Sequence, residues 1–325
     1  MKKINICWYC MMCLLLMTSC YEEYAKDYEY STTYFASQKP LRTVIADRDM
    51  SIKVGVAIGG KREVDTGDWA EFEIDPALLD GTGLTLLPKE YYTLSDANTF
   101  RVSKSSLAVA DVTINFTDAF YADENATKVY YALPFKITDS SLDKMLEGQE
   151  TSVVAIKYIS TYHGTYYVKG KLKELNAAGE VVETKIYENK DLSQNITRNV
   201  SSLSKNVIVR EGVADYTVAS TENVKMTMQP DHTVIVETLD GGLAITDGSG
   251  SFDDTKERLE ISLKYRFTKE GKLYEVEETL IRRQDPLKSN CGSSILTLMI
   301  AVRPSRISSP LKFGSFSRRS LFFLA

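Results

Sequence analysis

The sequence predicts an all-β protein, most simply a sandwich followed by a second sheet structure. Three segments, 52–58, 112–116 and 259–267, alternate apolar and polar residues with a period of two. That period is typical of strands with one face in a core and the other in water. Helical patterns are short and few, the best being Pro76 to Leu79 and Ser140 to Leu146. We therefore expect two antiparallel β units and little helix.

The first 19 residues have the features of a lipoprotein signal peptide. Lys2 and Lys3 precede an apolar run from Ile4 to Met17, which is too short to stay in a bilayer as a permanent helix. The run ends in Leu16-Met17-Thr18-Ser19-Cys20, which resembles a bacterial lipobox with Cys20 as the acylated residue. The alternative is a plain signal peptide with an incidental cysteine.

Residues 20–32 are predicted to form an acidic tether. Glu22 and Glu23 follow Cys20 closely, and this acidic pair resembles the surface-export signal of Bacteroidetes lipoproteins. The resemblance implies a protein that is lipid-anchored in the outer membrane and faces outward.

Residues 33–160 are predicted to form the first β domain. Every second position is apolar in 52–58 and in 112–116. Val153 to Ile159 reads as a further strand that would close this sheet.

Residues 161–286 are predicted to form the second β domain. Leucine, isoleucine and aromatic residues occupy alternate positions of 259–267. Asn176 to Glu180 and Lys269 to Lys272 read as hairpin turns, each with a glycine near the position that needs positive φ. The strands Val181 to Tyr187 and Leu273 to Ile281 are expected to follow them.

Residues 287–325 differ from the rest of the chain. They are serine-rich and contain six basic residues and no acidic one. One interpretation is a C-terminal membrane or partner-binding segment. The other is an out-of-frame translation of the native end, so we leave this basic tail out of the fold prediction.

Charge and cysteine content exclude several classes of function. The net charge is −5 although the tail is basic, so the body is more acidic than the whole, which argues against nucleic acid as a partner. Of five cysteines, only Cys291 lies beyond residue 20, so the mature chain is expected to form no internal disulfide. Two distant histidines do not make a zinc motif, and we expect no metal and no cofactor.

Several short motifs carry a family resemblance. They are Tyr34-Phe35-Ala36-Ser37, Val54 to Gly60, Leu87 to Tyr92, Asn115-Phe116-Thr117, Ala132 to Thr138 and Tyr158 to Tyr167. Together they resemble the N-terminal domain of a large family of Bacteroidetes surface lipoproteins. That domain of unknown function has an immunoglobulin-like fold, and in some members it precedes an endo-β-N-acetylglucosaminidase module.

The second half carries its own resemblance. Residues 165–286, above all Phe252-Asp253-Asp254 and Tyr265-Arg266-Phe267, are similar to the lipocalin-like domain that follows in other members. The resemblance thus implies an immunoglobulin-like β-sandwich followed by a lipocalin-like antiparallel β-barrel. Proteins of this shape are similar to accessory lipoproteins of glycan-utilisation loci.

No catalytic constellation is expected. The module that accompanies the first domain elsewhere uses the acidic motif D-x-x-D-x-D-x-E, which this sequence lacks, and Asp253-Asp254 reads as a solvated turn. His163 has no G-x-S-x-G elbow and is expected to form a hydrogen bond at the domain junction. We predict that the protein is not an enzyme.

Trp69 is the first candidate for ligand binding. Sugars pack their C–H faces on aromatic rings, so a binding platform needs an aromatic side chain that faces water. If Ala70, Phe72 and Ile74 face the core, Trp69 faces outward. The alternative is that Trp69 folds over a sheet edge or packs on the neighbouring domain.

Tyr162, Tyr166 and Tyr167 form a second candidate group, for which packing at the domain junction is the alternative. The resulting hypothesis is a non-catalytic, glycan-binding surface lipoprotein that is accessory to a polysaccharide-utilisation system. Its expected partners are a glycan, the outer membrane through the lipid anchor, and other outer-membrane uptake components. The alternative hypothesis is a structural or protein-interaction lipoprotein of an outer-membrane complex.

Overall fold

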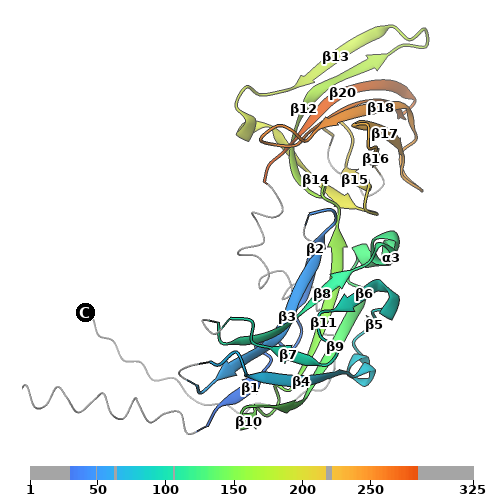
Figure 1. The fold of residues 1–325 in the computed structure, drawn as a ribbon. Helices are drawn as coiled ribbons and strands as arrows, with labels where there is room; N and C mark the ends of the chain where they lie inside the picture. Colours follow the sequence, from blue (N-terminus) through green and yellow to red (C-terminus); the bar gives the residue numbers. More distant parts are fainter. Residues whose placement is uncertain (1–29, 49, 62–63, 105–106, 217–221, 285–325) are drawn as a thin grey trace, which may run out of the picture.

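The computed structural model describes residues 30–48, 50–61, 64–104, 107–216 and 222–284 of the 325-residue chain. These residues form two β-sheets that follow one another along the chain (Figure 1). The predicted lipidation site Cys20, the export residues Glu22 and Glu23, and the basic tail lie outside the described residues. Within the described part, no helix is long and apolar enough to cross a membrane.

The first sheet has eleven strands in the order β10-β1-β3-β8-β7-β4-β9-β11-β2, with β5 added to β9 and β6 to β8. Its strands are β1 Thr32–Tyr34, β2 Leu41–Ile45, β3 Ser51–Gly59, β4 Trp69–Ile74, β5 Thr85–Leu86, β6 Tyr92–Leu94, β7 Thr99–Arg101, β8 Val109–Phe116, β9 Tyr131–Ser140, β10 Lys144–Met145 and β11 Thr151–Ile159. Its short helices are η1 Pro76–Leu79, η2 Lys89–Tyr91, α3 Asp118–Ala122 and η3 Glu124–Thr127.

This first sheet is open and curled, and its inward face encloses one apolar core. Period-two alternation explains why: in β3 the side chains of Val54, Val56 and Ile58 are buried, while their neighbours are partly exposed. Aromatic rings fill the centre of the core, where Phe72 stacks on Phe100 at a centroid distance of 4.3 Å.

The second sheet has nine strands, of which eight close into an antiparallel barrel through the pairing of β12 with β20. The strands are β12 Gly164–Leu175, β13 Val181–Tyr187, β14 Ile196–Ser202, β15 Val207–Glu211, β16 Asn223–Met228, β17 Thr233–Thr238, β18 Ile245–Asp253, β19 Glu260–Lys269 and β20 Lys272–Arg282, with one short helix η4 Leu192–Gln194.

Strand β12 is shared between the barrel and a projecting hairpin. Along one edge, its first half pairs with β14 and its second half with β13, while β20 pairs with its other edge from Tyr166 to Leu175. Gly170 lies at the changeover, where an added Cβ would come 2.4 Å from the carbonyl oxygen of Glu277. A side chain at this position would therefore push β20 away and open the barrel seam.

The all-β prediction is confirmed, and the alternating segments lie in β3, β8 and β19. Both hairpin turns are also confirmed, with Gly179 at φ 82° and Gly271 at φ 77°. The helix expected over Ser140 to Leu146 is wrong. The backbone N–H groups of Lys144 and Leu146 instead donate to carbonyl oxygens of the β1 segment, so the segment continues as strand β10.

A candidate binding groove where the two sheets meet

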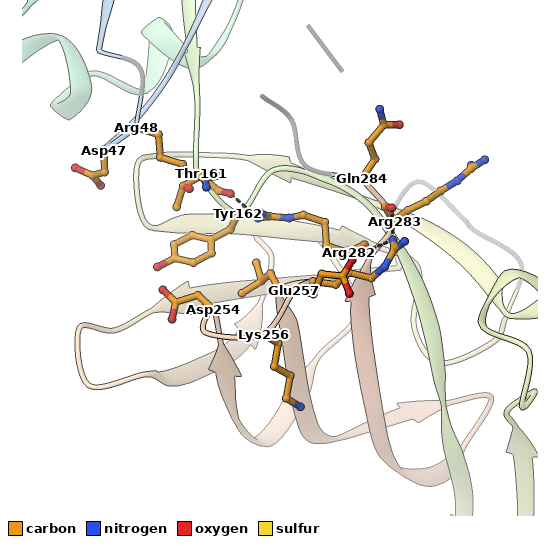
Figure 2. A pocket seen from close by; sticks show the side chains of 12 residues that line it. Asp47, Arg48, Thr161, Tyr162, Asp254, Lys256, Glu257, Arg282, Arg283 and Gln284 are labelled. Atoms are coloured by element: carbon orange, nitrogen blue, oxygen red, sulfur yellow. Dashed lines mark hydrogen bonds between the residues drawn. The ribbon is translucent and has the colours of Figure 1, made fainter. Parts of the chain in front are cut away.

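A groove of about 570 Å³ lies where the first sheet meets the barrel (Figure 2). The turn after β2 forms one side of the groove. The link between the two sheets, the loop before β19 and the end of β20 form its other sides. We call it the junction groove. Its lining residues are Asp47, Arg48, Thr161, Tyr162, Asp254, Lys256, Glu257, Arg258, Leu259, Arg282, Arg283 and Gln284.

The link between the sheets is held by hydrogen bonds to the barrel. The backbone N–H of Ser160 donates to the Ser202 hydroxyl at 2.8 Å, and the Ser160 hydroxyl donates to the Lys205 carbonyl oxygen at 2.7 Å. On the other side of the junction, the Lys205 ammonium contacts the Asp47 carboxylate at 2.7 Å. The turn after β2 is thereby tied to the loop between β14 and β15, which holds the two sides of the groove together.

Tyr162 is the aromatic residue of the groove. Its ring packs edge-to-face on Phe252 at 5.3 Å, and Phe252 in turn stacks on His232 at 4.8 Å. Figure 2 shows the Tyr162 side chain pointing between Asp47 and Asp254. Burial, and then these two carboxylates, raise the pKa of the Tyr162 hydroxyl, so it stays a hydrogen-bond donor at neutral pH.

Arginines brace the opposite wall. The Arg282 guanidinium donates to the Thr161 carbonyl oxygen and to the Tyr166 hydroxyl, the latter at 3.2 Å. Arg258 donates to the carbonyl oxygens of Arg282 and Arg283. Arg282 is buried and its bonds hold the wall in place, whereas Arg258 is exposed and can also donate to a ligand.

Three carboxylates line the groove, those of Asp47, Asp254 and Glu257, and all three residues are exposed to water. The Asp47 side chain is 50% exposed and pairs with Lys205, while the Asp254 side chain is 55% exposed and lies 3.8 Å from Nδ1 of His232. The groove thus combines one aromatic ring with negatively charged acceptors and positively charged donors. Such a set can bind the hydroxyl groups of a polar ligand and cover one apolar face of it.

The structure separates the predicted ligand residues. Trp69 begins β4, and Ala70 and Phe72 are buried beside it, which confirms the predicted direction of these two side chains. The Trp69 residue is half-buried, opposite Arg101 of β7. Figure 1 places β4 in the half of the first sheet away from the barrel, so Trp69 and the junction groove are different surfaces.

Tyr166 and Tyr167 lie on opposite faces of β12. Tyr166 is fully buried inside the barrel, where its hydroxyl donates to the Tyr162 carbonyl oxygen at 2.6 Å. A residue with no exposed surface cannot be a ligand platform, so Tyr166 supports the groove from behind instead. Tyr167 is half-buried on the outer face, and the trio does not converge on one site.

Two smaller predictions are confirmed. Nδ1 of His163 lies 3.3 Å from the Ser202 hydroxyl at the junction, and burial lowers the pKa of His163. Asp253 accepts hydrogen bonds from the N–H and the hydroxyl of Thr255, which is a solvated turn. Among the described residues, no group of three or more His, Cys, Asp or Glu side chains is placed to hold a metal ion.

A polar cluster inside the barrel was not predicted. The Arg210 guanidinium lies 3.1 Å from the Glu278 carboxylate, and both side chains are 0% exposed. The hydroxyls of Tyr187 and Tyr265 donate to the same carboxylate at 3.0 and 3.1 Å. Burial lowers the pKa of Arg210, but Glu278 together with Tyr265 and Tyr187 raises it by more, so the guanidinium stays charged inside the barrel.

Comparison with known proteins gives relatives for the fold and none with an assigned activity. A family model described as "-like, N-terminal domain" matches residues 27–144. No curated protein matches the chain.

Three crystal structures from Bacteroides ovatus match this chain over most of its length. A protein of unknown function is 21% identical with a TM-score of 0.68, over 79% of this chain and 96% of that chain. A multidomain protein including DUF1735 is 12% identical with a TM-score of 0.41, over 78% and 94% of the two chains. Another protein of unknown function is 12% identical with a TM-score of 0.42, over 77% and 90%. The first of these shares its fold with most of this chain.

Proposed function

We propose that this protein is a surface lipoprotein that binds a glycan in the junction groove without cleaving it. The observation that carries the proposal is Tyr162, a ring held between two exposed carboxylates in a groove of about 570 Å³. That volume lies within the range of about 300–1,000 Å³ for small-ligand sites. It suits one or two sugar rings better than an extended polymer.

The groove has the chemistry that sugars need. A pyranose offers an apolar C–H face, which the Tyr162 ring can cover, and a rim of hydroxyls. Asp47 and Asp254 supply acceptors for these hydroxyls, and the exposed Arg258 and Lys256 supply donors. The Tyr166 hydroxyl fixes the backbone beside Tyr162, so little ordering is needed when a ligand binds.

Binding without turnover is proposed because the groove carboxylates serve other contacts. A glycosidase needs one carboxyl that is kept protonated by an apolar surrounding and a second at a fixed separation. Asp47 instead pairs with Lys205, and Asp47, Asp254 and Glu257 all face water. We expect dissociation constants of roughly micromolar to millimolar, since most sugar hydroxyls stay in water.

A glycan array with four chains tests this proposal. Tyr162→Ala should weaken binding about tenfold or more, as loss of a stacking ring usually does. Trp69→Ala tests the alternative platform and should leave binding unchanged. Tyr130→Ala is the matched control, since Tyr130 is exposed and lies outside both surfaces. Loss of binding in Trp69→Ala alone would move the site to β4, and silence of the unchanged chain on all host and plant glycans would refute the proposal.

Turnover is tested on the same ligands. Reducing ends should not appear when the protein is incubated with any glycan that it binds. Their release in proportion to the protein added would contradict the non-catalytic proposal.

The anchor is tested separately. We propose that Cys20 is acylated and that Glu22 and Glu23 direct export, on the strength of the N-terminal motifs. Cys20→Ala should abolish labelling with a fatty acid, while Ala at both glutamates should keep the label and reduce surface protease shaving. A labelled Cys20→Ala chain would refute the anchor.

The alternative function, a protein-interaction lipoprotein, is favoured by one specific observation. Strand β13 leaves apolar side chains exposed at the end of the second sheet. No residue of β13 lines the junction groove.

A further inference from the structure

Strand β13 is an edge strand with an exposed apolar surface. Among the described strands it pairs with β12 alone, and Figure 1 shows it outside the barrel at the end of the molecule opposite β1. Val182 and Ile186 are 63% and 70% exposed, the largest values among the large apolar residues that the structure describes. Natural proteins usually protect such an edge, because its unpaired N–H and C=O groups invite another strand.

We propose that β13 is a self-association surface, on which β13 of a second copy pairs antiparallel about a twofold axis through Thr184. An antiparallel pair leaves alternate backbone groups of an edge strand directed outward, so β13 can form a ladder on its free side. A twofold axis makes the contact self-complementary, with each copy giving and receiving the same bonds.

The sequence of β13 is self-complementary in this register. With Thr184 opposite itself, Glu183 faces Lys185 of the partner subunit, and Lys185 faces Glu183 of the partner subunit. Val182, which forms a β-bulge in the pairing with β12, then lies nearest to Ile186 of the partner subunit on the other face of the new sheet. Opposite charges and paired apolar side chains are the combinations that stabilise neighbouring strands.

Other twofold registers are worse. An axis through Glu183 or Lys185 places two like charges directly opposite, which is destabilising. An axis through Val182 or Ile186 sets Glu183 and Lys185 opposite no charged residue of β13, so no oppositely charged pair forms. An axis between two residues would oppose side chains of different faces, which a regular antiparallel ladder does not allow. The register through Thr184 is therefore the one that a second copy should select.

The existing contacts of β13 allow this partner. Lys185 is 58% exposed although its ammonium contacts Asp215 at 2.7 Å, so it can reach a second carboxylate. The contact is small, however, because seven residues bury less than a standard interface. We therefore expect a weak dimer, with a dissociation constant on the order of 100 μM. It is independent of the glycan proposal, since β13 does not line the junction groove.

Cysteine cross-linking tests the register directly. The full chain, with its five cysteines replaced by serine and in mild detergent, receives either Thr184→Cys or Ile186→Cys. Two Thr184→Cys side chains would face each other at a distance that a disulfide can span. Two Ile186→Cys side chains would lie about 14 Å apart and serve as the matched control. We expect a disulfide-linked dimer from Thr184→Cys and not from Ile186→Cys, whereas a mixture of Val182→Cys and Ile186→Cys chains should cross-link with each other.

Charge reversal tests the pairing in the Thr184→Cys chain. Glu183→Lys or Lys185→Glu alone should slow cross-linking about fivefold or more, because each places like charges opposite, and the double reversal should restore it. Circular dichroism confirms that each exposed-site variant remains folded. Equal cross-linking of Thr184→Cys and Ile186→Cys, no cross-linking by Thr184→Cys, or no recovery in the double reversal would each overturn the proposal.

Discussion

The buried pair of Arg210 and Glu278 allows a sharp stability prediction. Glu278→Gln keeps the shape of the side chain but removes its charge, so Arg210 would stay ionised in the barrel with no carboxylate beside it. Both side chains are 0% exposed and 3.1 Å apart, so water cannot compensate for the loss. Breaking a buried pair on one side costs about 3–5 kcal/mol.

That cost sets the expected change in melting temperature. For a unit of this size each kilocalorie lowers the midpoint by roughly 3–5 °C, so Glu278→Gln should melt about 10–20 °C below the unchanged chain. Differential scanning calorimetry is the assay, because it resolves a transition of the barrel from one of the first sheet.

The neighbouring residue is the matched control. Glu277 points to the outer face, is 30% exposed in its side chain, and pairs with Lys171 at 2.6 Å and Lys173 at 2.8 Å. An exposed network of this kind contributes about 1 kcal/mol or less, so Glu277→Gln should lower the midpoint by only a few degrees. Equal losses in the two variants would refute the reasoning, since carbonyl oxygens of Gly212 and Ala214 would then suffice to hold the Arg210 charge.

Three further predictions follow from single groups. Burial raises the pKa of Tyr158 to about 12 from 10.0, so the contribution of Tyr158 to stability should be constant below pH 10 and fall from pH 10 to 12. Circular dichroism in an alkaline titration would show this loss, and a flat profile over that range would contradict it. Hydrogen bonds from Lys171 and Lys173 lower the pKa of Glu277 to about 2 from 4.5, so the contribution of Glu277 to stability is complete above pH 4.5 and is lost as the pH falls towards 2. In urea denaturation at a series of pH values, Glu277→Gln should reduce the loss of stability between pH 4.5 and 2. Tyr166→Phe removes the hydroxyl that bonds Tyr162 and Arg282, so it should lower the free energy of unfolding in urea by about 1–3 kcal/mol and weaken glycan binding. Unchanged values in both assays would show that the hydroxyl does not support the groove.

The strands were predictable because their signal is local. In β19, the apolar set of Ile261, Leu263, Tyr265 and Phe267 is buried as its spacing indicates. The hairpin turns were predictable for the same reason, since a glycine marks the position of positive φ. Ser140 to Leu146 was misread because β10 is held by a parallel pairing with β1, more than a hundred residues away along the chain, which no local pattern records.

The alternation of residues in β20 indicates that one charged side chain is buried. Glu277 and Glu278 are adjacent in β20, and adjacent residues of a strand point to opposite faces. One of the two glutamates must therefore enter the barrel, where it needs a cation. That cation is Arg210 on β15, which lies beside Glu278 only because the barrel closes. The sequence near β20 alone therefore could not identify it.

The junction groove was only partly predictable, since its walls come from positions near 47, 162, 254 and 282. Tyr162 was the one lining residue among the predicted ligand residues. The other lining residues lie near Tyr162 because the contact of Asp47 with Lys205 ties the turn after β2 to the barrel. That contact joins the two sheets, and the period-two pattern within each sheet gives no information about it.

Parity along β12 could have separated the three tyrosines. Tyr166 has the parity of Val168 and Leu172, the apolar set, whereas Tyr167 has the parity of the lysines at 169, 171 and 173. On a barrel strand the apolar set faces the interior, so Tyr166 had to be buried and Tyr167 had to face outward. Tyr162 precedes β12, so the alternation of the strand does not fix the direction of its side chain. Of the three tyrosines it alone can therefore turn its ring into the groove. The buried hydroxyl of Tyr166 holds the backbone of Tyr162 in place from within the barrel.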